Sequence, residues 1–462
     1  MQEMSRWCGN VPRCGSVLAS HLKEGDELYQ LKPLKTYALE AVRDDGLCMT
    51  RMERMLDAIG RSVSDIEWIS DNNLPEVVEE LSELWPPAEV PEGTPPTFMR
   101  PLVFTKVHTG EELPDISAKL LHWPDNTNEG TVRAILGQFE AIHAYHPYER
   151  DQEENRVCWP TWDFGTMMGC PHGCQYCGAG KSGKFITVGL NLEEFMEVVV
   201  PRTIAKYPWQ QCFRMIGWAA EMISFEPEYG CFDLYTRKLA EYDKYGYFHA
   251  ASSNVDWIAE LPRKDRLIAI FSVTCEAVAR DIEPGTGHAF DRFEAGRKCN
   301  EFGVPVRYKF KPMIPVRNWQ DEYARAIEQA LTVSEPESVG FCVIMWMNLE
   351  TLAGKIDLDL LDPEYVQAAR DAAAEMEGNV CAPFPHHARK AIYQYLIQQV
   401  RRWDDEVLLY VSTESREMWD ELKDELGQDP RAFFCGCSSV AVPGRKLSLS
   451  AGCPHSTYSP LA

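Results

Sequence analysis

The sequence predicts an α/β protein with a parallel βα sheet at its core, a helical N-terminal extension and a C-terminal cap. From residue 161 onward, short apolar runs alternate with longer segments of helical period. This alternation is typical of βα units in a parallel sheet, and right-handed crossovers curl such a sheet toward a barrel or a doubly wound arrangement. The composition, 45% hydrophobic and 25% charged over 462 residues, is that of a globular chain with a well-buried core.

The strands and helices of the core are expected in alternation. The strand candidates are 211–218, 247–252, 267–273, 304–310 and 339–347. The helical candidates between and after them are 192–206, 232–245, 290–302, 319–333 and 363–376.

Four segments are expected along the chain. Residues 1–97 form the helical extension and end in a linker, because residues 86–96 hold five prolines and one glycine. Residues 98–160 are a lead-in segment and residues 161–376 are the barrel core. Residues 377–462 form the cap, which carries a second group of cysteines.

The charge and the cysteine content restrict the partners and the compartment. The net charge is −24, and binding to a phosphate backbone relies on Lys and Arg, so nucleic acid is an unexpected partner unless a local basic groove exists. The first twenty residues lack an apolar stretch of signal-peptide length. We therefore expect a cytoplasmic protein without membrane contact, whose 16 cysteines are thiols or metal ligands rather than disulfides.

Three cysteines lie close together in the segment TMMGCPHGCQYCGAG. Cys170, Cys174 and Cys177 are spaced by four and three residues on a loop that contains Gly and Pro. Thiolates of this kind bind iron–sulfur clusters, zinc or Cu(I). Three ligands leave one iron of a four-iron cluster open, whereas a structural zinc site usually has four protein ligands. The alternative is a zinc site with His172 or a distant cysteine as its fourth ligand; the absence of paired C-x2-C knuckles argues against it.

This motif resembles that of the radical S-adenosylmethionine (radical SAM) superfamily. The resemblance implies an open, partial (β/α)6 barrel as the core. It further implies a [4Fe–4S] cluster whose open iron binds S-adenosylmethionine, and reductive cleavage of that cofactor to a 5′-deoxyadenosyl radical. It also implies a one-electron reductant such as flavodoxin or ferredoxin. Tyr176 matches the aromatic position that packs near the adenine in the superfamily; simple packing of a loop aromatic is the alternative.

The stretch 270–323 resembles the spore photoproduct lyase branch of that superfamily. The residues that carry this resemblance include Phe271-Ser272-Val273, Glu283-Pro284-Gly285-Thr286, Arg292, Trp319 and Tyr323. One departure concerns the thiol that returns hydrogen to the product in photoproduct lyases. Met222 or Ile223 stands where that thiol is expected, and Cys212 and Cys231 only flank the position.

The resemblance also suggests which side chains hold S-adenosylmethionine. Glu221 matches the acidic residue that binds the methionine amino group. Further candidates for the ribose hydroxyls and the carboxylate are Ser252, Ser253, Asn254, Ser272 and Arg292. An Arg fork suits a carboxylate because it binds two oxygens, but a helix-cap or surface role is the alternative for each residue taken alone.

Two further groups are candidates for catalysis and for metal binding. Lys309 and Lys311 alternate along one expected strand and therefore point to the same face, toward a substrate inside the barrel or toward solvent. Cys435, Cys437 and Cys453 could hold a second iron–sulfur cluster or a zinc ion, or pack as free thiols.

These observations predict a radical SAM enzyme of the lyase or dehydratase type that abstracts hydrogen from a small polar molecule. A sugar, an aminosugar or a nucleoside fits the acidic charge, with dehydration or epimerisation in natural-product biosynthesis as the reaction. The first alternative is a DNA lesion repair enzyme similar to spore photoproduct lyase. The second is a non-catalytic zinc-binding module.

Overall fold

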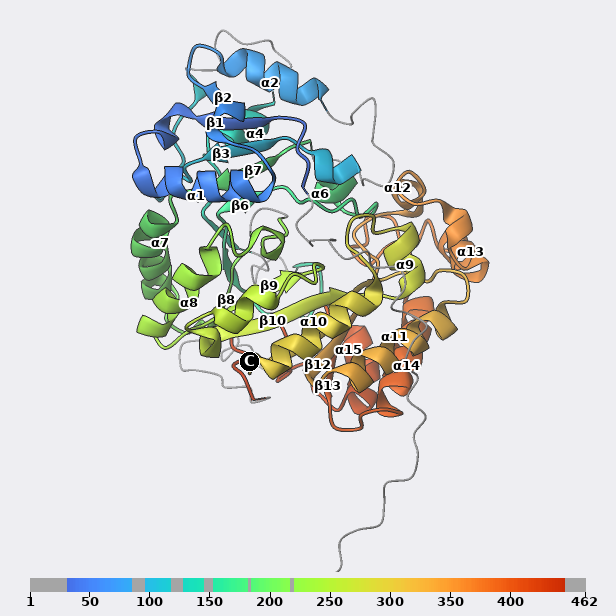
Figure 1. Ribbon diagram of the computed structural model, residues 1–462. Helices are drawn as coiled ribbons and strands as arrows, with labels where there is room; N and C mark the ends of the chain where they lie inside the picture. The colour runs from blue at the N-terminus through green and yellow to red at the C-terminus, as the bar shows by residue number, and fades with distance from the viewer. Residues whose placement is uncertain are drawn as a thin grey trace, which may run out of the picture.

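The computed structural model describes residues 31–84, 96–117, 128–144, 153–181, 184–216 and 220–444. Most of the expected proline-rich linker and the candidate ligand Cys453 lie outside the described residues. The described chain forms two main parallel sheets, each with its own neighbouring helices (Figure 1).

The larger sheet is the partial barrel. Its six strands are all parallel and follow the order β13-β12-β11-β10-β9-β8. In the described chain the two edge strands do not pair with each other, so the barrel is open. Phe164 of β5 (Trp162–Phe164) extends the β8 edge through a parallel bridge to Met215. The strands are β8 (Cys212–Arg214), β9 (Tyr245–Ala250), β10 (Leu267–Val273), β11 (Val306–Met313), β12 (Pro336–Val343) and β13 (Leu408–Val411).

The smaller sheet has the order β2-β1-β3-β7-β6, in which only β6 is antiparallel to its neighbour. The described part of the N-terminal extension therefore contains helices and also two strands that the sequence does not predict. These strands are only four residues long, which is too short for a clear period-two pattern. The bounds are β1 (Thr36–Leu39), β2 (Ile66–Ile69), β3 (Leu102–Thr105), β6 (Met167–Met168) and β7 (Ile186–Gly189), with β4 (Ile142–Ala144) and β5 (Trp162–Phe164) forming a separate antiparallel pair.

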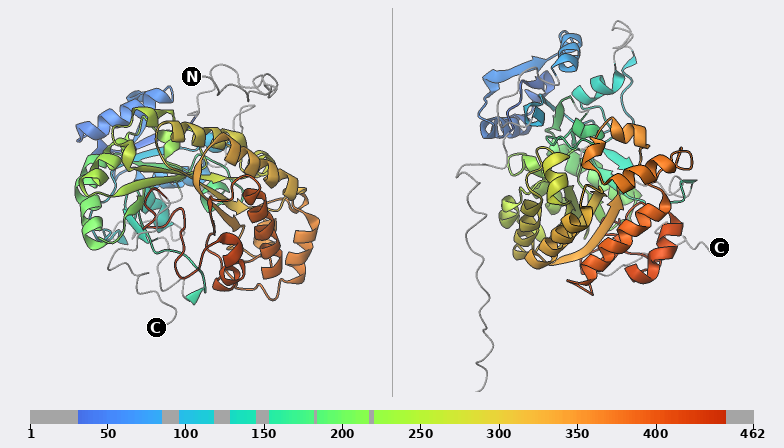
Figure 2. Two further views of the ribbon diagram at one scale, coloured as in Figure 1. Left: turned by 90° about the horizontal axis from the view of Figure 1, so that it is seen from below. Right: turned by 90° about the vertical axis from the view of Figure 1, so that its right-hand side faces the viewer.

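Helices cover the outer face of the barrel sheet (Figure 2). Two of them, α7 (Leu192–Lys206) and α11 (Trp319–Val333), have the bounds that the sequence predicts. The other barrel helices are α8 (Cys231–Glu241), α9 (Glu276–Asp281), α10 (Ala289–Glu301), α12 (Leu349–Ala353) and α13 (Pro363–Asp371), and the cap adds α14 (His386–Arg401) and α15 (Arg416–Leu426). The helices of the smaller sheet and the lead-in are α1 (Gly46–Ala58), α2 (Leu74–Glu83), α4 (Glu129–Ile135) and α6 (Gly178–Lys181).

The inner face of the barrel is partly polar and is covered by the end of the described chain. Successive strand residues point to opposite faces, so one face packs under helices with Phe271 and Tyr308, while the other carries Lys309. The segment 433–444 packs against that inner face, where Cys437 contacts a cluster that includes Tyr247. The cap thus contributes side chains to the inside of the barrel.

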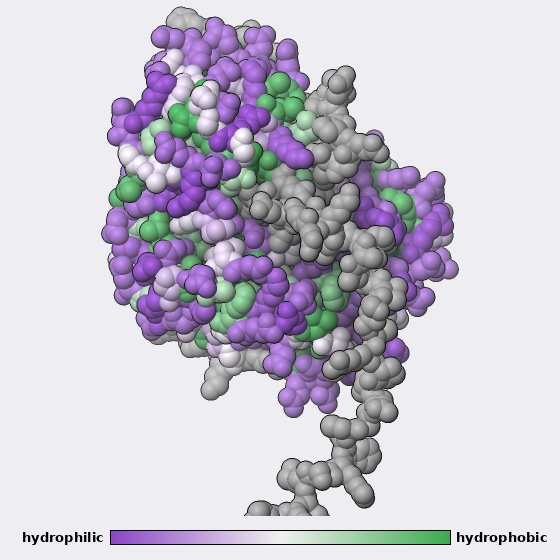
Figure 3. Space-filling model, viewed as in Figure 1, coloured by the Kyte–Doolittle hydropathy of each residue, from purple (hydrophilic) through white to green (hydrophobic). Residues whose placement is uncertain are grey.

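The side of the molecule shown in Figure 3 is predominantly hydrophilic, with apolar residues scattered singly. Among the described helices, none combines the length and the apolar character that crossing a bilayer requires.

Candidate active site

The three-cysteine loop lies between β6 and α6, and two glycines allow its path. Gly169 has a φ of +92°, and a Cβ at this position would lie 2.6 Å from the carbonyl oxygen of Phe185. A Cβ on Gly173 would lie 2.7 Å from Cγ2 of Thr97. Gly169 is therefore required by backbone shape, and Gly173 by the close approach of its neighbours.

Backbone contacts attach this loop to the turn that follows α9. The N–H of Gly173 donates to the carbonyl of Pro284 at 2.7 Å, and the N–H of Gln175 donates to that of Ile282 at 2.9 Å. Arg100, which is 1% exposed, donates to the carbonyl oxygens of Cys170 and His172. The loop is thus fixed through its backbone, which leaves the cysteine sulfurs available to a metal.

Tyr176, Glu283 and Arg292 form a buried chain of hydrogen bonds. The Tyr176 hydroxyl donates to Oε1 of Glu283 at 2.8 Å, and Nη2 of Arg292 lies 2.7 Å from Oε2 of the same carboxylate. Arg292 also donates to Oγ1 of Thr286 and to the carbonyl of Ser272. The structure therefore brings Tyr176, Ser272 and Arg292 together, with Arg292 holding Glu283; a direct contact between Arg292 and S-adenosylmethionine stays a prediction.

Glu221 and His172 present two unpaired acceptors beside the cysteine loop. Nδ1 of His172 lies 2.8 Å from the carbonyl of Gly285 and must donate to it, which leaves Nε2 as an acceptor in the neutral ring. Burial lowers the pKa of His172 to about 3 and raises the pKa of Glu221 to about 7. Within the described chain, Nε2 of His172 and Oε1 of Glu221 are buried without a hydrogen-bond partner. Two acceptors that face one space favour a ligand that donates N–H groups, such as an amine.

The residues after β9 lie beside Glu221. The N–H of Ala251 donates to Oε2 of Glu221 at 2.8 Å, so this strand end fixes the carboxylate. Asn254 donates through Nδ2 to the carbonyls of Ile223 and Glu226, which is a structural role for its side chain. Ser252 is buried and Ser253 is partly buried at the same strand end, so both stay candidates for contact with a cofactor.

The two candidate lysines occupy different surroundings on β11. Lys309 is 3% exposed, and its Nζ lies 3.0 Å from Sγ of Cys437. Lys311 lies nearer the carboxyl end of the strand, with Nζ 3.4 Å from Oγ1 of Thr413 and 4.6 Å from the ring centre of Trp346. Both face the inside of the barrel, in agreement with one of the two orientations left open by the sequence.

Two of the three candidate metal-binding cysteines of the C-terminal cap lie inside the barrel. Sγ of Cys435 and Sγ of Cys437 are 3.5 Å apart. The hydrogen bond from Cys435 and the nearby Lys309 ammonium lower the pKa of Cys437 well below that of a free thiol, despite burial. At the position where the resemblance places a donor thiol, Met222 and Ile223 are both buried in the hydrophobic core.

Several polar residues of the barrel are not identified by the sequence. His249 bonds to Oγ of Ser272 at 2.9 Å, and Nε of Arg214 donates to the buried carboxylate of Asp163 at 2.9 Å. Trp346, three residues after β12, is 47% exposed and has a φ of +65°. Their positions could have identified Arg214, His249 and Trp346, since each is at or near the carboxyl end of a parallel strand, where such barrels place their chemistry.

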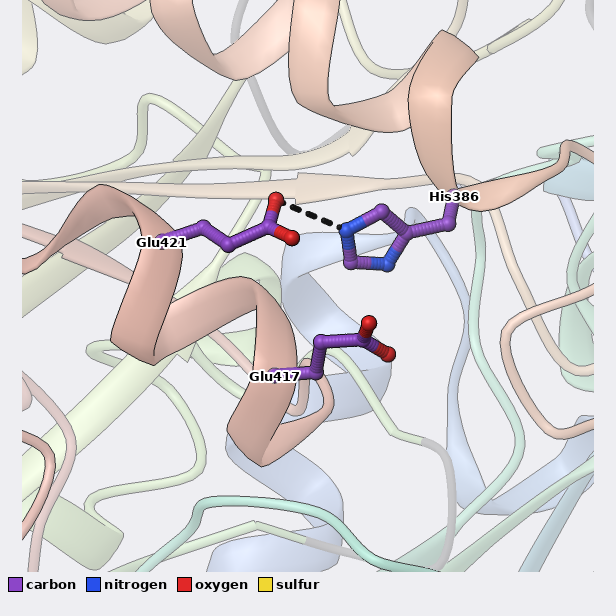
Figure 4. Close-up of side chains that lie close together, drawn as sticks. All are labelled: His386, Glu417 and Glu421. Carbon is purple, nitrogen blue, oxygen red and sulfur yellow. Dashed lines mark hydrogen bonds and ion pairs between the residues drawn. The ribbon is translucent and has the colours of Figure 1, made fainter.

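A separate group of possible ligands lies at the surface, where α14 meets α15 (Figure 4). Nε2 of His386 lies 3.0 Å from Oε2 of Glu421, and Glu417 lies beside them. The ammonium of Lys390 also contacts Glu421 at 2.9 Å, so a cation of the chain already pairs with this exposed group. We interpret the group as a contact between two cap helices.

Comparisons with known proteins identify a similar family and a similar fold. The family model described as "Spore photoproduct lyase" matches residues 164–349. Solved structures of spore photoproduct lyase match at 13% identity. A double mutant with bound AdoMet and dinucleoside spore photoproduct, and a second structure complexed with dinucleoside spore photoproduct, each cover 82% of this chain and 98% of their own, with a TM-score of 0.53. A search of curated proteins found no match.

The open barrel and the three-cysteine loop resemble those of the radical SAM superfamily. Within that superfamily, the chain resembles the spore photoproduct lyase branch. This resemblance implies a [4Fe–4S] cluster and S-adenosylmethionine as cofactors. The residues present fit both groups, because three free thiols share one loop and the unpaired acceptors of Glu221 and His172 suit the amino group of S-adenosylmethionine.

Proposed function

We propose that the chain is a radical SAM lyase that splits a dinucleotide-type lesion, as the structures of spore photoproduct lyase with dinucleoside spore photoproduct suggest. The observation that carries this proposal is the family match over residues 164–349, which contain the cysteine loop and five of the six barrel strands. The preference for a sugar or aminosugar rests on net charge, and no contact among the described residues favours it over the lesion.

In the proposed reaction, the bound cluster and S-adenosylmethionine supply a 5′-deoxyadenosyl radical, and the protein positions the groups around it. Cys170, Cys174 and Cys177 hold the cluster. Glu221 would accept N–H groups from the methionine end, and the Glu283 carboxylate orients Tyr176 beside the loop. The buried polar barrel interior keeps the radical away from bulk water.

Two residues at the carboxyl ends of β11 and β12 support a nucleotide substrate. The ring of Trp346 is half exposed, and a nucleobase can stack on such a surface. The ammonium of Lys311 lies beside that ring and suits a phosphate or a carbonyl oxygen. A tryptophan with positive φ costs of order 1–3 kcal/mol, and such strain clusters at functional sites.

The net charge of −24 limits the size of the proposed nucleic-acid substrate. Long-range repulsion opposes a duplex much more than a dinucleotide, which carries a single phosphate. We therefore propose a short or single-stranded lesion, with flavodoxin or ferredoxin as the electron donor.

A substrate panel tests this function. The reconstituted enzyme is incubated anaerobically with S-adenosylmethionine, a reductant and either dinucleoside spore photoproduct, a nucleoside, a sugar or an aminosugar. We expect substrate-dependent product only with the dinucleoside, detected by mass spectrometry as two separated nucleosides. Turnover of a sugar or aminosugar and none of the dinucleoside would replace this proposal with the small-metabolite interpretation.

A further inference from the structure

The turn Cys435-Gly436-Cys437 brings two free thiols together inside the barrel. Their sulfurs are 3.5 Å apart, and neither is in a disulfide. Gly436 is required here, because a Cβ would lie 2.8 Å from both Oγ of Ser338 and Oη of Tyr410. Two barrel strands also hold the turn: Arg307 donates to the carbonyl of Gly436 at 2.7 Å, and the Tyr247 hydroxyl donates to that of Cys437 at 2.9 Å.

The lysine beside this pair assigns a different role to each sulfur. The Lys309 ammonium can only donate hydrogen bonds, so Sγ of Cys437, at 3.0 Å, is the acceptor. Cys435 then donates its S–H toward Cys437. The arrangement is that of one thiol and one thiolate, with the buried cation offsetting the negative charge.

The pair also shares a small cavity with polar side chains of the barrel strands. Cys435 and Cys437 line a cavity of about 10 Å³, the room of a single water molecule, together with His249 and Lys309. Lys309 is opposite Ser272 in the register between β10 and β11, and Ser272 bonds to His249. Lys309 therefore contacts Cys437 and has Ser272, near the carboxyl end of β10, as its neighbour in the sheet.

We propose that Cys435 and Cys437 are a catalytic dithiol that quenches the substrate-derived radical and ends as a disulfide. This inference rests on the proposed function for the source of the radical. It places the hydrogen donor on the C-terminal cap, on a segment remote in sequence from the position after β8 where Met222 and Ile223 stand.

The step balances in atoms and electrons. The S–H bond of Cys435 breaks homolytically, and its hydrogen atom forms a C–H bond with the carbon radical. The Cys435 thiyl radical then bonds to the Cys437 thiolate, and the resulting S–S radical anion gives one electron to the oxidised form of the one-electron reductant. The disulfide is reset by an external dithiol through exchange.

A metal ion on the same sulfurs is the competing interpretation, and the position of Lys309 opposes it. An ammonium 3.0 Å from Sγ of Cys437 already neutralises the thiolate, and a divalent cation would be forced close to this like charge. Zinc or additional iron bound through these two residues would overturn the proposal.

The test measures whether the hydrogen atom gained by the product comes from an exchangeable thiol and whether the two thiols become a disulfide. The wild-type enzyme turns over the dinucleoside in D2O, and free thiols are then alkylated and mapped by mass spectrometry. We expect deuterium in the product and a Cys435–Cys437 disulfide in stoichiometric amount. In Cys435→Ala, 5′-deoxyadenosine still forms, but deuterium transfer and the disulfide are lost; Cys299→Ala, which removes a buried thiol on α10, behaves like the wild type.

The outcomes separate the two proposals. If wild-type enzyme converts the dinucleoside and Cys435→Ala gives the same deuterated product, the dithiol is not the donor. If the wild type does not convert the dinucleoside, the proposed function fails. The dithiol is then tested separately, by treating the protein with a small-molecule thiol oxidant. The dithiol proposal is supported if the oxidant forms an intramolecular Cys435–Cys437 disulfide, and forms it more slowly in Lys309→Met. Two thiols that stay unpaired overturn that proposal.

Discussion

The guanidinium of Arg292 lies 2.7 Å from the carboxylate of Glu283, and both side chains are almost fully buried. This pair joins helix α10 to the turn that holds the three-cysteine loop. The other carboxylate oxygen of Glu283 accepts the Tyr176 hydroxyl. The pair therefore connects the barrel to the cluster loop and fixes an aromatic ring beside it.

Replacing Arg292 by Met should destabilise the protein and loosen the loop. The change leaves Glu283 buried without its cation, which costs about 3–5 kcal/mol. Thermal unfolding and iron content measure the two effects. Arg297→Met on the same helix is the matched control, because Arg297 forms partly exposed ion pairs worth about 0–1 kcal/mol. Equal effects of the two substitutions would contradict the structural role of Arg292.

Replacing Cys174 by Ala should abolish both the cluster and cofactor cleavage. The reconstituted wild type should hold about four irons per chain, the content of one [4Fe–4S] cluster. We expect the variant to lose this iron and its 5′-deoxyadenosine product, while Cys299→Ala keeps both. A second cluster in the cap would instead give about eight irons in the wild type, and a zinc site would give a colourless protein.

Binding of S-adenosylmethionine should weaken as the pH falls, through Glu221. Burial raises the pKa of Glu221 to about 7 in the free protein. The ionised carboxylate is the form that accepts the amino group, so protonation competes with binding below that pH. The Kd of the reconstituted enzyme should rise by about tenfold from pH 8 to pH 6 from this group.

Glu221→Gln isolates the contribution of Glu221 to the pH dependence of S-adenosylmethionine binding. The amine of the ligand titrates equally in both variants, so the difference between the two pH profiles belongs to residue 221. The Gln variant should bind more weakly at pH 8 and should lack the extra loss at pH 6. Parallel profiles would show that Glu221 is not a ligand contact.

Replacing Trp346 by Ala should raise KM for a dinucleotide substrate with little change in 5′-deoxyadenosine formed per product. Loss of stacking costs about 1–3 kcal/mol per base. Trp403→Ala is a matched control, because Trp403 is 49% exposed and follows α14. An unchanged KM would remove Trp346 from the substrate site; Lys311→Met, which removes the neighbouring cation, tests the phosphate contact in the same assay.

The sequence predicts the barrel well because its strands and helices are long enough to show a periodic pattern of apolar and polar residues. α7 and α11 begin and end at the expected residues, and β10 does as well. The sequence does not predict the strands of the smaller sheet, because β1 and β2 have four residues each. Local pattern carries too little information in such short elements.

The site is predictable where a motif lies within one loop and is not predictable where it depends on contacts between distant segments. Cys170, Cys174 and Cys177 are close in sequence. The contact between Lys309 and Cys437 joins residues 128 positions apart, and no spacing rule brings them together. The sequence alone makes Cys435 and Cys437 candidate metal ligands because it does not show the lysine beside them.

The most direct test of the central claim is anaerobic turnover of dinucleoside spore photoproduct by the reconstituted wild type and Cys174→Ala. Mass spectrometry quantifies 5′-deoxyadenosine and the separated nucleosides in each sample. We predict that the wild type forms the two nucleosides in a reaction that needs S-adenosylmethionine and that Cys174→Ala forms neither these nor 5′-deoxyadenosine. A wild type that leaves the dinucleoside intact while forming 5′-deoxyadenosine with a sugar or aminosugar would contradict the account.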